Sequence, residues 1–255
     1  GLPQRVQQRR PNLALVASEF FTHLPLGQDA LVSNASNPTV LIFGLVFLVS
    51  GIAFKLGVVP FHMWVPDVYQ GAPTAVTLLI AAAPKLAAFA LLFRLLINTL
   101  LPLISDWQPM LMILAVLSLV IGNITAIAQT NIKRMLAYSS IAHAGFLLTG
   151  VIALNRAGLA ATLYYLLAYG FITIGAFGVI TLVRDSSGEI TDLNRWAGLG
   201  RRSPKIAALF SFFLLAFAGI PLTSGFIGKF AIFSAAYESG ATAVVIVGVL
   251  SSAIA

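Results

Sequence analysis

Apolar runs, each close to the length needed to cross a membrane, dominate this sequence. A helix needs about 20 apolar residues to span the hydrocarbon core of a bilayer, and only short polar joints separate the runs. Only 9% of the 255 residues are charged and 59% are hydrophobic, too few polar side chains to cover a water-soluble domain. We therefore predict an all-α, polytopic transmembrane helix bundle with seven spans, the last one cut short: residues 38–59, 73–98, 107–129, 135–154, 158–183, 205–237 and 240–255.

The two ends of the chain differ in character. Residues 1–37 are the least membrane-like part and carry several charges, so we predict an extramembrane segment there, with room for one short amphipathic helix. Residues 38–255 are predicted to form the transmembrane domain. The chain begins at Gly1 and stops at Ala255 inside an apolar run, and we expect it to be part of a longer protein.

Composition also limits the chemistry. The chain has no cysteine, which removes thiolate ligation of iron–sulfur clusters, disulfides and thiol catalysis. No glycine-rich nucleotide-binding motif follows a strand, so we expect this chain to bind no cofactor. The net charge of +7 would also suit a nucleic-acid-binding protein, but basic cytoplasmic loops of a membrane protein give the same balance. The lipid bilayer, and not nucleic acid, is the expected partner.

Loop charges predict the orientation. The joint at 130–134 and the loop at 184–205 are separated by two spans, so they lie on the same side of the membrane. The opposite side carries only Arg94, at a helix end, and Arg156. The excess of basic residues in these two joints predicts that both are cytoplasmic. The basic residues are Lys133, Arg134, Arg184, Arg195, Arg201, Arg202 and Lys205.

Two of the runs do not behave as simple straight helices, because proline and glycine interrupt them at residues 57–66 and 219–225. Proline removes a backbone donor and clashes with the preceding turn, and in lipid the freed groups need partners inside the protein. Many transporters build ion sites from such discontinuous helices, while an ordinary kink is the alternative. Two breaks, each with a lysine nearby, favour the functional interpretation.

Three lysines lie where charge is unfavourable: Lys55, Lys85 and Lys229. Lys85 is 12 residues into its helix, about 18 Å from the start, and a charge at the centre of a bilayer costs at least about 2.5–3.5 kcal/mol. A hydrated interior lowers that cost, and burial favours the neutral form of lysine. His143 lies on the fourth span, and histidine is the side chain that ordinarily exchanges a proton near neutral pH. Together these four side chains predict a proton relay.

Each of these residues also has a structural interpretation. Lys55 suits an interfacial anchor, Lys85 and Lys229 could serve packing alone, and His143 could simply donate a hydrogen bond across helices. Asp67, beside Pro66 in an expected loop, suits a turn or a cap as well as a functional role.

Three segments resemble the antiporter-like membrane subunits of respiratory complex I. They are FKLGVVPFHMWVPDVYQGAPT at 54–74, QTNIKRMLAYSSIAHAGF at 129–146 and LAFAGIPLTSGFIGKF at 215–230. The likeness covers residue 38 to the end. It implies a 14-helix fold with two inverted five-helix repeats, of which the spans here are helices 7 to 13, with helices 7 and 12 broken.

The same resemblance implies roles for particular residues. Lys55, Lys85 and Lys229 match the lysines of helices 7, 8 and 12, and His143 falls near the helix 10 position of a hydrated central axis. The family's glutamate on helix 5 and lysine on helix 6 lie outside this sequence. The implied protein is a bacterial inner-membrane subunit that moves protons and lies beside other membrane subunits. It contributes no redox site to the NADH–quinone oxidoreductase, whose NADH, FMN, iron–sulfur clusters and quinone belong to other subunits.

Two other functions remain open at this point. A subunit of a sodium/proton antiporter would use the same lysines but draw its energy from an ion gradient. A scaffold that joins neighbouring membrane subunits without pumping is the other alternative, although it would gain nothing from burying lysines.

Overall fold

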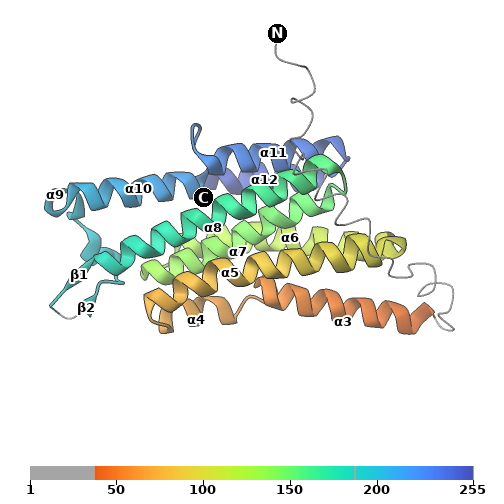
Figure 1. Cartoon of the computed structure of the whole chain (residues 1–255), viewed down its shortest axis with the longest axis horizontal. Helices are drawn as coiled ribbons and strands as arrows, with labels where there is room; N and C mark the ends of the chain where they lie inside the picture. Colours follow the sequence, from red (N-terminus) through yellow and green to blue (C-terminus); the bar gives the residue numbers. More distant parts are fainter. Residues whose placement is uncertain (1–37, 187, 255) are drawn as a thin grey trace, which may run out of the picture.

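The computed structural model describes residues 38–186 and 188–254, which form a bundle of long, nearly aligned helices (Figure 1). The segment 1–37, predicted to lie outside the membrane, falls outside the described residues. The helices are α3 (Pro38–Leu56), α4 (Trp64–Gly71), α5 (Thr74–Leu92), η1 (Phe93–Thr99), η2 (Leu101–Leu103), α6 (Ile104–Ile127), α7 (Ile132–Ile152), α8 (Arg156–Leu182), η3 (Leu193–Trp196), α9 (Leu199–Arg202), α10 (Pro204–Ala218), α11 (Ser224–Glu238) and α12 (Thr242–Ile254). A hairpin of β1 (Arg184–Asp185) and β2 (Gly188–Glu189) follows α8.

The predicted fold class is confirmed. Five helical stretches within the described residues are long and apolar enough to cross a membrane. The predicted sixth span is divided between α10 and α11, and α12 is a shorter apolar helix. Since α10 and α11 have 15 residues each, or about 22 Å apiece, neither alone reaches across the hydrocarbon core.

Helix α7 lies at the centre of the bundle. In the most apolar 18-residue stretch of α7, 83% of the residues are buried, whereas in the corresponding stretch of α3 only 28% are buried. It packs against α4, α6, α8 and α11, while α5 packs along α8. Polar side chains on α7 therefore face other helices and not lipid, which is the condition under which a transmembrane helix tolerates them.

The first break follows α3. Gly57 adopts a positive φ of 70°, which glycine tolerates without steric penalty. The backbone N–H of Val59 donates to the Ser118 hydroxyl at 2.9 Å, and the Trp64 indole donates to the carbonyl of Phe54 at 2.9 Å. The groups freed by the break thus find partners inside the protein, as a membrane requires.

The second break separates α10 from α11. Gly219 ends α10 with a φ of 79°, and the Thr223 hydroxyl accepts the backbone N–H of Phe226 at 3.3 Å to cap the start of α11. Gly225 lies against the end of α10, so that a Cβ there would fall 1.8 Å from the carbonyl oxygen of Ala216. This discontinuous helix therefore depends on close backbone contact between its halves.

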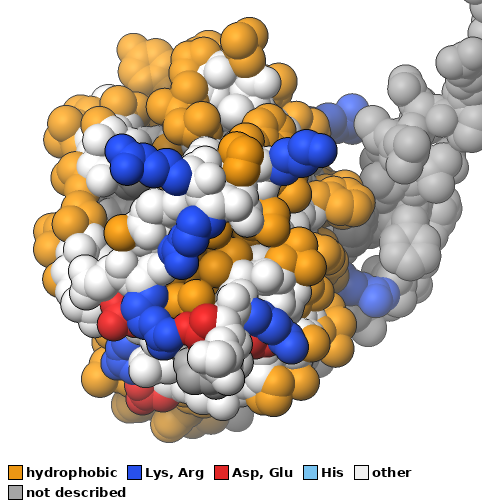
Figure 2. Space-filling view, turned by 90° about the vertical axis from the view of Figure 1, so that its left-hand side faces the viewer, with side chains coloured by type: hydrophobic (Ala, Val, Ile, Leu, Met, Phe, Trp, Pro, Cys, Tyr) orange, Lys and Arg blue, Asp and Glu red, His pale blue; other side chains and the backbone are white. Residues whose placement is uncertain are grey.

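The two basic loops lie together, which confirms their predicted placement on one side. The backbone N–H of Ile132 donates to the carbonyl of Thr191 at 2.8 Å, and the backbone N–H of Leu193 donates to the carbonyl of Thr130 at 2.9 Å. Figure 2 shows this end of the bundle, where Lys and Arg side chains gather over the end that carries β1, β2 and α9. That this end is cytoplasmic stays a prediction.

The placement of Lys133, Arg134 and Asp67 in loops is wrong. Asn131 caps α7 by accepting the backbone N–H groups of Lys133 at 3.0 Å and Arg134 at 3.2 Å, so both basic residues lie in the first helical turn. Lys133 is buried at 4% exposure. Asp67 lies in the first turn of α4 and pairs with Arg134 at 2.6 Å. The charges of these residues predicted loops. The sequence does not show that neighbouring helices cover the ends of α4 and α7, where charged residues can lie inside a helical turn.

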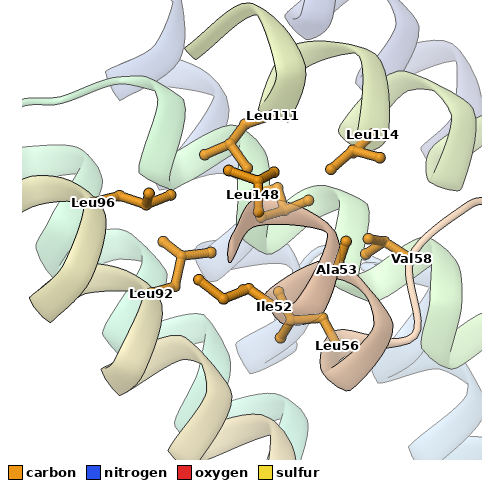
Figure 3. A pocket seen from close by; sticks show the side chains of 10 residues that line it. Ile52, Ala53, Leu56, Val58, Leu92, Leu96, Leu111, Leu114 and Leu148 are labelled. Atoms are coloured by element: carbon orange, nitrogen blue, oxygen red, sulfur yellow. The ribbon is translucent and has the colours of Figure 1, made fainter. Parts of the chain in front are cut away.

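One face of α3 packs into the core and the opposite face is exposed. Figure 3 shows the packed face meeting α5, α6 and α7 in a wholly apolar space that leaves no room for water (volume ≈ 0 Å³). The exposed large side chains of α3 include Val40, Phe43, Phe47 and Phe54. Helix α3 thus lies at the edge of the described residues.

We predict that Gly225→Ala destabilises the protein by about 1–3 kcal/mol, because the new methyl group would overlap the backbone at the end of α10. Gly178→Ala on α8 is the matched control, since a Cβ there meets nothing within 4 Å. Thermal unfolding of the full-length protein in detergent would measure both. Equal midpoints for the two variants would contradict the close contact.

Candidate functional site: buried basic side chains linked by hydroxyl groups

Lys85 lies inside the bundle near the middle of the 26-residue span Thr74–Thr99 and is 5% exposed. Its ammonium donates to the carbonyl of Ser140 at 2.6 Å and to the Ser140 hydroxyl at 2.5 Å, and it lies 3.5 Å from the hydroxyl of Tyr169. The Ser140 hydroxyl also meets the Tyr69 hydroxyl at 3.3 Å. Lys85 on α5 is thereby connected to α4, α7 and α8 through hydroxyl groups.

His143 is buried on α7 at 4% exposure. Its Nδ1 shares a 2.6 Å hydrogen bond with the hydroxyl of Tyr165 on α8, and which atom donates depends on the imidazole tautomer. The cross-helix hydrogen bond considered as the structural alternative is therefore present. A hydrogen bond of this kind is also what a proton carrier needs, so the bond does not separate the two roles.

Lys229 on α11 is 3% exposed and reaches back across the second break. Its ammonium donates to the carbonyls of Phe217 at 2.9 Å and Ala218 at 3.0 Å, and to the Ser252 hydroxyl at 3.2 Å. Phe217 and Ala218 are the last residues of α10, so their carbonyls lack helical partners and carry the negative end of the helix dipole. Breaking the helix thus creates the site that holds the cation.

His143 lies between the two lysines. Its ring is 5.1 Å from that of Tyr169, which Lys85 approaches at 5.0 Å. Its ring is 6.0 Å from that of Phe146, which Lys229 approaches at 4.5 Å. The charges of both lysines act on His143. The structure therefore brings together Lys85, His143 and Lys229.

Lys55 does not join this group. It lies in the last turn of α3, just before the first break, and is exposed at the edge of the described residues. The expectation that all three lysines are buried is therefore wrong for Lys55 within the described chain. The physical reason is that the apolar run predicts a helix but does not say which face of it meets other helices.

Within the described ranges, none of these buried basic groups has a carboxylate partner. The ion pairs found among the described residues are Arg134–Asp67, Arg184–Glu189 and Arg195–Asp185, and all of them lie at the basic end of the bundle. The same residues contain no group of three His, Asp or Glu side chains placed to hold a metal ion. The buried cations are thus held by neutral hydroxyl and carbonyl oxygens.

Sequence reasoning missed the hydroxyl groups that surround the basic side chains. Tyr165 and Tyr169 are four residues apart and Ser140 and His143 are three apart, spacings that place each pair on one helix face. Of these, only Ser140 lies at helical spacing from His143 itself, and the packing of α8 against α7 brings Tyr165 and Tyr169 to it. Tyr69 gave no such signal, because only the fold brings α4 against α7.

These observations define a polytopic helical membrane protein with two broken helices and a buried group of basic side chains. Residues 19–255 match the family model described as NADH:quinone oxidoreductase/Mrp antiporter, TM. The chain belongs to this family, and the resemblance to the antiporter-like membrane subunits of complex I is confirmed.

Curated relatives carry the name NADH-quinone oxidoreductase subunit N. The relative from Rhodococcus opacus is 58% identical over 232 residues, which is 91% of this chain and 43% of the relative. A relative from Streptomyces griseus, named subunit N 3, is 60% identical over 226 residues, 89% of this chain and 41% of the relative. The chain therefore spans less than half the length of the curated relatives it matches.

Solved structures share the fold. A chain of respiratory complex I from Thermus thermophilus with bound aureothin has a TM-score of 0.74 and 34% identity, covering 95% of this chain and 54% of that one. A chain of the Mrp complex from Dietzia sp. has a TM-score of 0.79 and 24% identity, covering 95% of this chain and 47% of that one. The second likeness concerns the fold alone.

We predict that Tyr165→Phe lowers the free energy of unfolding by about 1–3 kcal/mol, because it leaves a buried imidazole nitrogen of His143 without its partner. Tyr164→Phe is the matched control, since Tyr164 is exposed at 42%, and it should change stability by less than about 0.5 kcal/mol. Chemical denaturation of the full-length protein in detergent would compare them. If the two variants were equally stable, the His143–Tyr165 bond would have no energetic weight.

Proposed function

We propose that the longer protein to which this chain belongs is a proton-translocating membrane subunit of an NADH–quinone oxidoreductase. The observation that carries the proposal is the burial of Lys85, His143 and Lys229 among hydroxyl and carbonyl oxygens, without a carboxylate partner in the described residues. A permanently charged ammonium in such a place is costly. A group that gains and loses a proton meets that cost for only part of a cycle.

The proposed path runs through the bundle from Lys85 past His143 to Lys229. Lys85 exchanges its proton through the hydroxyls of Ser140 and Tyr169, and His143 exchanges through Tyr165. Aromatic rings fill the space between the three groups, so transfer between them requires water that enters as the rings move. Lys229 then releases the proton on the outer side of the membrane.

In this proposal Lys55 takes up protons on the cytoplasmic side. Lys55 is exposed at the end of α3, so we propose that it meets further helices of the longer protein. The family's helix 5 glutamate would supply the carboxylate partner there. Redox chemistry takes place on other subunits of the complex, which hold the NADH, FMN, iron–sulfur clusters and quinone, and neighbouring membrane subunits are the partners.

The names and identities of the relatives favour this assignment over a sodium/proton antiporter subunit. Relatives named subunit N are 58% and 60% identical, whereas the Mrp chain is 24% identical. Purification of the protein with its partners would separate the two, because only the oxidoreductase couples NADH oxidation to transport.

We predict that Lys85→Met or Lys229→Met lowers the number of protons pumped per NADH oxidised, because each change removes a group that carries the proton. Lys205→Met, at an exposed position at the start of α10, should leave that number unchanged. Proton uptake by proteoliposomes containing the full complex, with NADH oxidation measured in parallel, gives the ratio. A scaffold role predicts the opposite: unchanged pumping per NADH and poorer assembly of the complex.

A further inference from the structure

Lys133 is a buried cation that the proposed path does not use. It is the second residue of α7, and neighbouring residues cover it to 4% exposure. Its ammonium donates to the carbonyl of Ala72 at 2.6 Å. A cation at a helix N-terminus opposes the helix dipole, and burial adds a desolvation cost. Packing alone would be served better by an apolar side chain.

One carboxylate, with a hydroxyl group bonded to it, lies near Lys133. The Glu189 carboxylate on β2 acts electrostatically on the Lys133 ammonium, and it accepts a hydrogen bond from the Thr74 hydroxyl. Glu189 also pairs with Arg184 at 3.4 Å, and its side chain is 25% exposed. Lys133 is therefore close to an ion pair of the basic end.

On its inner side, polar groups lead from Lys133 toward Lys85. The Ala72 carbonyl that holds Lys133 is also 3.4 Å from the Thr77 hydroxyl, which donates to the carbonyl of Tyr69 at 3.2 Å. The Tyr69 hydroxyl meets that of Ser140, and Ser140 accepts from Lys85. Thr77, Tyr69 and Ser140 are all buried, at 0%, 2% and 2% exposure. Polar groups of Thr77, Tyr69 and Ser140 thus lie between Lys133 and Lys85, with the ring of Tyr69 separating its carbonyl from its hydroxyl.

We propose that Lys133 is an electrostatic gate which limits the access of protons from the basic end of the bundle to Lys85. A fixed positive charge at the mouth of a polar path repels a second cation, as in channels that exclude protons by a positive charge. This inference rests on the proposed function, because a gate matters only if Lys85 passes protons onward. The Ala72 carbonyl holds the ammonium by a hydrogen bond, and the Glu189 carboxylate, which Thr74 orients, attracts it.

The test uses the full complex in proteoliposomes and measures how fast an imposed pH gradient decays without NADH. Lys133→Gln keeps a hydrogen-bond donor toward Ala72 but removes the charge. Lys133 lies seven residues before Ser140, the partner of Lys85, on the same helix, about 10 Å at 1.5 Å per residue. We expect the decay to accelerate on the order of tenfold, the effect of removing a unit charge at that distance at an effective dielectric of about 20. Lys133→Arg keeps the charge, so the pH gradient should decay as slowly in this variant as in the unaltered complex.

Two further variants make the result specific. Arg134→Gln removes the neighbouring charge, which is paired with Asp67 at the surface, and should leave the decay unchanged. The double variant Lys133→Gln, Lys85→Met should return to slow decay, because the leak passes through Lys85. A leak that persists in the double variant would come from disturbed packing and would overturn the gate.

The outcomes separate the gate from the proposed function. If Lys133→Gln lowers pumping per NADH without faster decay, Lys133 is a carrier or a structural residue, and the gate is wrong while the relay stands. If Lys85→Met alone leaves pumping per NADH intact, the relay itself fails. Unchanged decay in Lys133→Gln, in a complex that still pumps, also overturns the gate.

Discussion

The structure depends on how cations are held inside an apolar bundle without negative side chains close to them. Lys229 solves this through the second helix break: α10 ends at Ala218, and its last carbonyls accept the ammonium at 2.9 and 3.0 Å. The helix end is needed for the cation, and the cation satisfies carbonyls that would otherwise lack partners in lipid. Lys85 has no such break beside it. It takes the carbonyl and hydroxyl of Ser140 instead, so its binding depends on α7 lying close to α5.

Helix α7 is where these requirements meet. It carries Ser140 toward Lys85 and His143 toward Tyr165, and almost its whole length is buried. A helix with this many polar groups can lie in a membrane protein only when other helices surround it. The first break contributes less to the buried group. Its freed backbone groups bond to Ser118 and Trp64, and it leaves Lys55 at the edge of the described residues, where a further helix would be needed to complete the site.

The same reasoning gives meaning to the charges at the basic end. Arg134 and Asp67 form an exposed pair, which contributes at most about 1 kcal/mol to stability. Lys133, one residue earlier, is buried on a backbone carbonyl. Two adjacent basic residues thus have different surroundings: one is paired with a carboxylate at the surface and the other is held by a carbonyl inside the bundle.

The sequence by itself determined the helical membrane class, the spans to within a few residues, both breaks and the identities of Lys85, His143 and Lys229 as misplaced polar groups. It could do so because the lengths of apolar runs, the position of proline and the cost of charge in lipid are local properties. Only the tertiary structure decided which face of each helix meets another. That is why Lys55 proved exposed, Lys133 proved buried, and Tyr69, Tyr165 and Tyr169 joined the site: contacts between helices far apart in sequence depend on packing, which no single segment encodes.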